Sequence, residues 1–189
     1  MRTRTITILV GLVGLALLAA SCGAETEAPP AVAPAEPQRV TLDWVEPYPT
    51  TGPRLVFTTT SLEVTRDGWE ARVSIENRTD ITWELATDPV AVQQGFGLML
   101  FETGELEELE RRTRDGDMPG IRAAQEFTPP LAAVLDPGQS WEGRISAPGT
   151  LAAGRYARVV FGTLTAVGDP PEGLGARIVW ITDHAYRLE

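Results

Sequence analysis

The chain has 189 residues but only one histidine and one cysteine, so few side chains could act as a nucleophile or a general base. His184 follows Asp183, and a Ser-His-Asp arrangement for nucleophilic catalysis would require this histidine. The sequence contains no G-x-S-x-G motif that could supply the nucleophile. We therefore interpret His184 as a strand-end or surface residue, and we expect no enzymatic activity.

Two aspartates in a charged segment, Asp115 and Asp117, could supply oxygen ligands to calcium. They follow three arginines that would compete for the same carboxylates: Arg111, Arg112 and Arg114. The EF-hand pattern is missing, and one histidine with one cysteine gives no zinc-ligand spacing, so we predict no metal and no cofactor. The dense mixed charge suits either a protein partner or solubility alone. These five residues are the candidate binding loop.

The cysteine, Cys22, follows an apolar run that covers residues 6–18, and three small residues separate it from that run. Two arginines precede the run, which completes the pattern of a secretory signal peptide. The run is shorter than the roughly 20 residues that a membrane span needs. An ordinary signal peptide with an incidental cysteine is one interpretation of this pattern.

The same residues resemble a bacterial lipoprotein signal, although Ala19 stands where that class of signal prefers leucine. The resemblance implies that Cys22 receives a diacylglycerol on its sulfur and becomes the first residue after cleavage. It also implies a protein anchored to the cell membrane, on the exported face. A thioether-linked lipid would explain a lone cysteine in an exported protein.

Composition divides the remaining chain into two parts. Residues 22–50 are rich in proline, alanine and glutamate, which predicts an extended, flexible stalk after a signal peptide at 1–21. Residues 51–189 have the length of one domain. The net charge of −10, with arginine as the only basic residue type besides histidine, disfavours nucleic-acid binding and electrostatic docking on an anionic membrane.

The dominant period in residues 51–189 is two. In WEARVSIEN, residues 69–77, apolar side chains alternate with polar ones, which is typical of a half-buried strand. Similar runs occupy 54–64, 81–85, 96–102, 121–127, 140–147, 156–167 and 176–183. Proline, glycine and aspartate separate them. The pattern predicts an all-β fold, an antiparallel sandwich or barrel of about 7–9 strands.

One motif specifies the sandwich further. Leu151-x-x-Gly154-x-Tyr156 follows a Pro-Gly turn and a strand, and it leads into another strand. It resembles the tyrosine corner of immunoglobulin-like sandwiches, in which the tyrosine hydroxyl bonds back to the backbone. With VSIEN before a turn, residues 54–165 resemble bacterial immunoglobulin-like modules, including the family of an intracellular proteinase inhibitor. The resemblance implies an immunoglobulin-like β-sandwich, but no inhibitory loop can be matched residue by residue.

Two features leave alternatives open. Residues 103–120 contain glutamate–arginine pairs spaced four apart that would support a helix, yet we favour a hairpin or short turn because short helices are marginal alone. Three tryptophans, Trp69, Trp83 and Trp141, have the phase of core residues, whereas Trp44 is the best candidate for an exposed aromatic.

The sequence therefore predicts a non-catalytic lipoprotein whose exported domain binds a partner at the cell envelope. Its expected partners are the membrane, through the lipid on Cys22, and an envelope protein. A proteinase-inhibitor-like module and a structural spacer are the alternatives.

Overall fold

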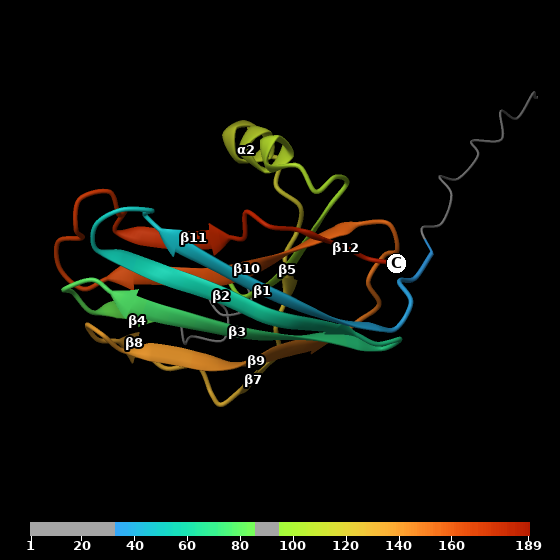
Figure 1. Ribbon diagram of the computed structural model, residues 1–189, viewed down its shortest axis with the longest axis horizontal. Coiled ribbons are helices and arrows are strands. Elements are labelled where there is room, and N and C mark those ends of the chain that lie inside the picture. The colour runs from blue at the N-terminus through green and yellow to red at the C-terminus, as the bar shows by residue number, and fades with distance from the viewer. Residues whose placement is uncertain (1–32, 86–94) are drawn as a thin grey trace, which may run out of the picture. The chain divides into compact units, whose positions relative to one another are not determined.

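The computed structural model describes residues 33–85 and 95–189. The predicted signal peptide, Cys22 and the first part of the predicted stalk lie outside the described residues. The described residues form two antiparallel sheets that pack face to face (Figure 1). The prediction of an all-β sandwich is confirmed.

The first sheet contains five strands in the order β1 (Gln38–Tyr48), β2 (Arg54–Val64), β3 (Gly68–Arg78), β9 (Ser140–Pro148) and β7 (Glu126–Thr128). The second sheet contains β6 (Arg122–Ala123), β5 (Gly97–Phe101), β10 (Tyr156–Ala166), β4 (Trp83–Leu85) and β8 (Val134–Leu135). Two further strands, β11 (Arg177–Ile181) and β12 (Tyr186–Arg187), pair with β10. Strand β10 is central, because Val160 pairs with Gly97 of β5 on one side and with Ile181 of β11 on the other.

The core lies between the two sheets. The alternating apolar residues predicted on β3 are all buried, and so are Trp83 and Trp141 on their own strands. Phe57 of β2 meets Phe161 of β10 across the core, with ring centroids 5.1 Å apart. The period of two therefore identified the buried faces correctly, because one face of each long strand is covered by the other sheet.

Strand β1 corrects the predicted domain boundary. The prediction assigned residues up to 50 to the stalk, but Gln38–Tyr48 pairs along β2 as the edge strand of the first sheet. Its alternate side chains, including Val40, Leu42 and Trp44, pack against the core. Trp44 is thus a partly buried residue, and the folded domain includes residues well before 51. The proline-rich composition on both sides of this strand concealed its alternation.

A second correction concerns residues 121–127, which were predicted as one strand. They form β6 and β7, which belong to different sheets. The chain crosses between the sheets at Ala124, whose amide bonds to the carbonyl of Phe96, and Gln125, whose amide bonds to that of Ser146. Because such a crossing does not interrupt the alternation of apolar and polar residues, sequence periodicity cannot reveal it.

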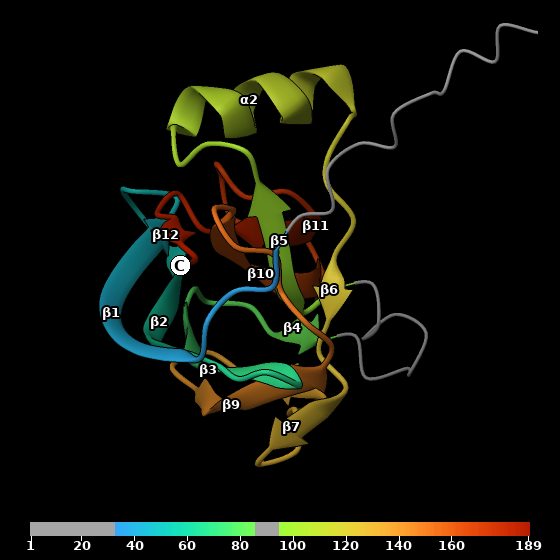
Figure 2. The same ribbon diagram turned by 90° about the vertical axis from the view of Figure 1, so that its right-hand side faces the viewer.

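The third correction concerns the charged segment, which forms a helix, α2 (Leu106–Asp115), and not a hairpin. Figure 2 shows α2 lying over the second sheet, on the side away from the first sheet. Its buried residue Leu109 packs in a small cluster with Met99, Phe101 and Val160. Gly116 ends the helix with φ +73°, and its amide bonds to the carbonyl of Arg112. Packing and this cap stabilise a helix that would be marginal alone.

Tyr156 does not form the tyrosine corner that the sequence motif predicts. Its ring packs in the apolar cluster beneath α2, and it approaches Gly104 so closely that a Cβ there would lie 2.8 Å from the ring. The described part of the chain offers its hydroxyl no backbone partner. Tyr156 thus contributes to seating the segment that enters α2.

A buried asparagine organises the opposite end of the sandwich. The Asn77 side chain donates to the carbonyls of Ile81 and Leu135, at 2.8 and 2.9 Å, and accepts from the amide and hydroxyl of Thr79. Asn77 is fully buried. Its amide therefore links the β3–β4 turn to β8 and satisfies backbone groups that would otherwise be unpaired.

The substitution Asn77→Ala is expected to lower the free energy of unfolding by about 2–4 kcal/mol, because it leaves buried carbonyls without donors. The measurement is urea unfolding followed by tryptophan fluorescence. The neighbouring Arg78→Ala is the control, since it removes only an exposed ion pair with Glu76 and should change the free energy of unfolding much less. Equal losses in the two variants would contradict the role given to Asn77.

Candidate functional site

A buried carboxylate lies where the edge of the first sheet meets the segment between β11 and β12. Glu46 of β1 is only 5% exposed. One of its oxygens, Oε2, accepts from the Trp180 indole at 2.7 Å and from the Asp183 amide at 3.0 Å. The other, Oε1, accepts from the His184 amide at 3.1 Å and lies 2.8 Å from His184 Nδ1. Three N–H donors and one ring nitrogen of His184 therefore surround this buried carboxylate.

The local structure of β1 helps to position Glu46. The register against β2 shifts between Thr41 and Trp44, and Asp43 has a left-handed φ of +50°. Such a bulge inserts one residue into an edge strand and increases its twist. Beyond it, Trp44 stacks on the His184 ring, with centroids 5.6 Å apart. Trp44 and Glu46 together hold His184 at the surface, and its Nε2 is the ring nitrogen left for an external group.

A buried cation holds the neighbouring backbone. Arg158 of β10 is fully buried and donates to the carbonyls of Thr182 and Asp183, which follow β11. It also donates to the carbonyls of Gly104 and Glu105, which precede α2, at 2.9 and 3.0 Å. Burial lowers the pKa of Arg158, against the effect of nearby carboxylates, but a guanidinium remains charged in proteins. Arg158 therefore fixes the segments on both sides of the site.

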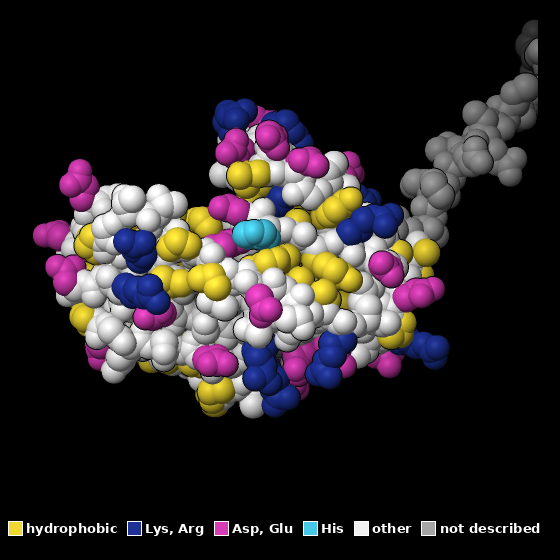
Figure 3. Space-filling model, viewed as in Figure 1, with side chains coloured by type: hydrophobic (Ala, Val, Ile, Leu, Met, Phe, Trp, Pro, Cys, Tyr) yellow, Lys and Arg dark blue, Asp and Glu magenta, His cyan; other side chains and the backbone are white. Residues whose placement is uncertain are grey.

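A groove lies between these two segments, bounded by α2 and β11, with a volume of about 520 Å³. Its apolar lining includes Leu106 and Leu109 of α2 and Val179 and Ile181 of β11. Two of these side chains face solvent, since Leu106 is 40% exposed and Val179 is 49% exposed. Figure 3 shows acidic and hydrophobic side chains, with the histidine among them, on the surface below the helix.

The charged lining of the groove consists of Glu110, Asp183 and Arg114. Burial raises the pKa of Asp183, and the negative charges of Glu46 and Glu110 raise it further, against the opposing effect of Arg158 and His184. The carboxylate of Asp183 thus has both acidic groups and the buried guanidinium of Arg158 near it, and desolvation has the largest effect on its pKa. A cationic group at this point would lower the cost of ionising it.

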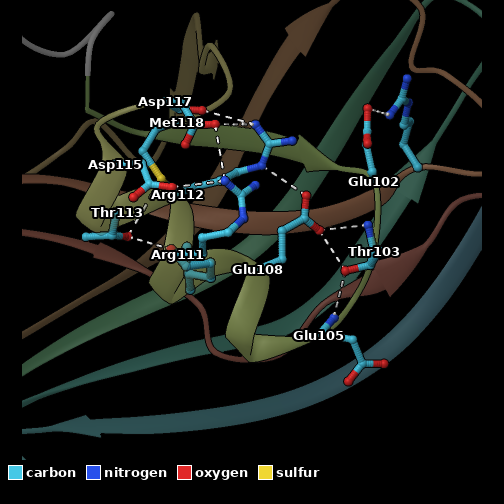
Figure 4. Close-up of polar contacts among 12 residues, drawn as sticks. Glu102, Thr103, Glu105, Glu108, Arg111, Arg112, Thr113, Asp115, Asp117 and Met118 are labelled. Atoms are coloured by element: carbon cyan, nitrogen blue, oxygen red, sulfur yellow. Dashed lines mark hydrogen bonds and ion pairs between the residues drawn. The ribbon is translucent and has the colours of Figure 1, made fainter.

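Most of the predicted binding-loop residues pair with one another on α2 and just beyond it (Figure 4). Arg111 lies 3.1 Å from Asp115 and 3.6 Å from Asp117. Arg112 lies 3.0 Å from Glu108 and 3.6 Å from Asp117. Arg114, in contrast, lines the groove. The structure therefore brings four of the five residues together as an ion-pair network, and it places the fifth at the apolar groove.

Glu108 connects this network to the start of the helix. Its Oε2 accepts from the amide and hydroxyl of Thr103, at 2.8 and 2.7 Å, and its Oε1 accepts from Arg112 (Figure 4). Burial acts to raise the pKa of Glu108, but the hydrogen bonds from Thr103 and the ion pair with Arg112 outweigh it and lower the pKa from 4.5 to about 2. Glu108 thus ties the segment before α2 to the helix itself.

The sequence identified His184 but not its partner. The ring bonds to Glu46, which is 138 positions away, and not to the adjacent Asp183. A carboxylate that orients a histidine is two-thirds of a catalytic triad, but among residues 33–85 and 95–189 no serine or threonine hydroxyl bonds to the ring. Within the same residues, no group of three or more histidine, cysteine and acidic side chains could hold a metal ion.

Comparisons with protein-family models, curated proteins and solved structures find no match for this chain. In the described part of the chain, no helix has the length and apolar character to cross a membrane. The features of this chain that indicate a function are therefore the groove, the groups that surround it and the sequence of the N-terminal segment.

The substitution Glu108→Gln is expected to lower the free energy of unfolding by about 1–2 kcal/mol at neutral pH, because it removes charge-assisted hydrogen bonds. The folded-state pKa lies below the unfolded value, so this contribution is complete above about pH 4.5 and is lost as the pH falls towards about 2. The measurement is urea unfolding of both proteins across this pH range. The control is Glu107→Gln on the exposed side of α2, and a constant difference between wild type and E108Q at every pH would contradict the assignment.

Proposed function

We propose that this protein is a lipoprotein, anchored at the exported face of the cell membrane by a diacylglycerol on Cys22, and that its β-sandwich is a non-catalytic binding module. The groove between α2 and β11 is the binding surface. The observation that carries the proposal is the exposure of Leu106 and Val179 in a groove with a charged lining. Exposed apolar side chains gathered in a groove mark a contact site more often than an ordinary surface.

The backbone around the groove supports this proposal. Arg158 holds the segments before α2 and after β11, and Glu46 holds the latter segment from the other side. A binding surface benefits from such a rigid frame, since less conformational entropy is lost when a partner binds. The proteinase-inhibitor and spacer alternatives remain predictions from sequence, and no contact among the described residues favours either over a binding module.

The anchor can be tested with Cys22→Ala. Wild-type protein is expected in the membrane fraction, with an intact mass that begins at residue 22 and includes acyl chains. The variant is expected to lose both the acyl mass and the membrane association, because the sulfur is the site of lipidation. A wild-type protein that is processed but carries no lipid would contradict the proposed anchor.

The binding surface can be tested with a photo-crosslinking amino acid at position 179 of the full-length protein in its native cells. A discrete crosslinked envelope protein is expected, because Val179 lies in the groove. The matched control is position 167, since Val167 is equally exposed at 49% but does not line the groove. The same pattern of products at both positions, or none at 179, would count against the groove as the binding surface.

A further inference from the structure

We infer that the groove binds a segment of a partner protein in which an arginine or lysine side chain lies next to an apolar side chain. This inference rests on the proposed binding function and adds the chemical class of the partner. It follows from the two kinds of surface that meet in the groove. The apolar floor consists of Leu106, Leu109, Val179 and Ile181, and the acidic mouth consists of Glu110 and Asp183.

The apolar floor selects for an apolar side chain of the partner. Leu109 and Ile181 lie at the bottom, where they join the cluster that seats α2, and Leu106 and Val179 are the more exposed positions. These four residues come from two elements that Arg158 holds in fixed relation. The floor is therefore preformed, and filling it would remove Leu106 and Val179 from water.

The acidic mouth selects for a cation. The Asp183 carboxylate has no ion-pair or hydrogen-bond partner among the described residues, whereas its own backbone amide and carbonyl are both engaged. Glu110 lies on the facing helix, and the charge of Glu46 lies behind Asp183. Among the described lining residues, Arg114 is the one cation against the two carboxylates of Glu110 and Asp183, and behind Asp183 the charge of Arg158 opposes that of Glu46. A guanidinium or ammonium group would therefore be attracted to Asp183.

The charge of the groove decides between classes of partner. Nucleic acids and anionic lipid headgroups would meet carboxylates at the mouth, and the chain as a whole carries −10. A polyamine would satisfy Asp183 but would leave the apolar floor exposed to water. A polypeptide segment with a basic and an apolar side chain matches both parts of the surface at once.

The test uses the full-length protein in a neutral detergent and three fluorescent peptides of equal length, with binding followed by fluorescence anisotropy. One peptide alternates arginine and valine, the second replaces arginine with glutamate, and the third replaces valine with serine. Only the first is expected to bind with measurable affinity. Equal binding of the second would overturn the role of the acidic mouth, and equal binding of the third would overturn the role of the floor. A polyamine that displaced the first peptide as effectively as unlabelled peptide would also overturn the role of the floor.

Variants locate the binding on the protein. Asp183→Asn and Glu110→Gln are each expected to weaken binding about threefold to fivefold, as an exposed ion pair would. Asp169→Asn is the control, since Asp169 is exposed in the loop before β11 and does not line the groove. Val179→Ser is expected to weaken binding about fivefold, and Val167→Ser to leave it unchanged. Circular dichroism confirms that each variant is folded, and equal affinity of D183N and D169N would overturn the inference.

The outcome also separates this inference from the proposed function. A crosslinked envelope protein at position 179, together with no binding of the basic peptide, would keep the groove as a binding surface and overturn the class of partner. If no protein is crosslinked and no peptide binds, both the groove as a binding surface and the class of partner are overturned.

Discussion

The site depends on one buried charge, the guanidinium of Arg158. Burying a cation in a protein is costly unless its donors are satisfied. The two terminal nitrogens of Arg158 donate to four backbone carbonyls, and the ring centroid of Phe101 lies 5.4 Å from the guanidinium carbon, whereas Nε has no hydrogen-bond partner among the described residues. Because the carbonyls come from two separate segments, the cation can stay buried only while both segments keep their places. The position of α2 over the second sheet follows from this constraint as much as from the packing of Leu109.

Glu46 imposes a complementary constraint on one of those segments. The carbonyls of Thr182 and Asp183 point to Arg158, and the amides of Asp183 and His184 point to Glu46. The backbone between β11 and β12 is therefore held between a buried cation and a buried anion. A fixed backbone that presents side chains at the surface is an arrangement that binding sites commonly use, and here it presents Asp183 beside the His184 ring, which Glu46 and Trp44 hold in place.

The sequence was sufficient for the long strands, because a face covered by another sheet imposes a period of two on every residue of the strand. It was insufficient where tertiary contacts outweigh local preference. The helix at residues 106–115 depends on one buried leucine and on ion pairs that suit a turn equally well, and β1 lies in a proline-rich context that resembles a tether. The Glu46–His184 pair joins residues from opposite ends of the chain, which no local pattern can indicate.

The edge strand β1 also determines how far the groove can lie from the proposed anchor. Its partner contacts begin before the strand itself, since the amide of Ala35 already bonds to the carbonyl of Leu151. The carbonyl of Ala33 likewise accepts from the amide of Ala153. Eleven steps of chain separate Cys22 from Ala33, and fully extended they could reach about 40 Å. If Cys22 carries the proposed lipid, a tether of this length would keep the groove close to the membrane surface. A partner in the same layer would meet it at a high effective concentration, so a weak contact would suffice for lasting association.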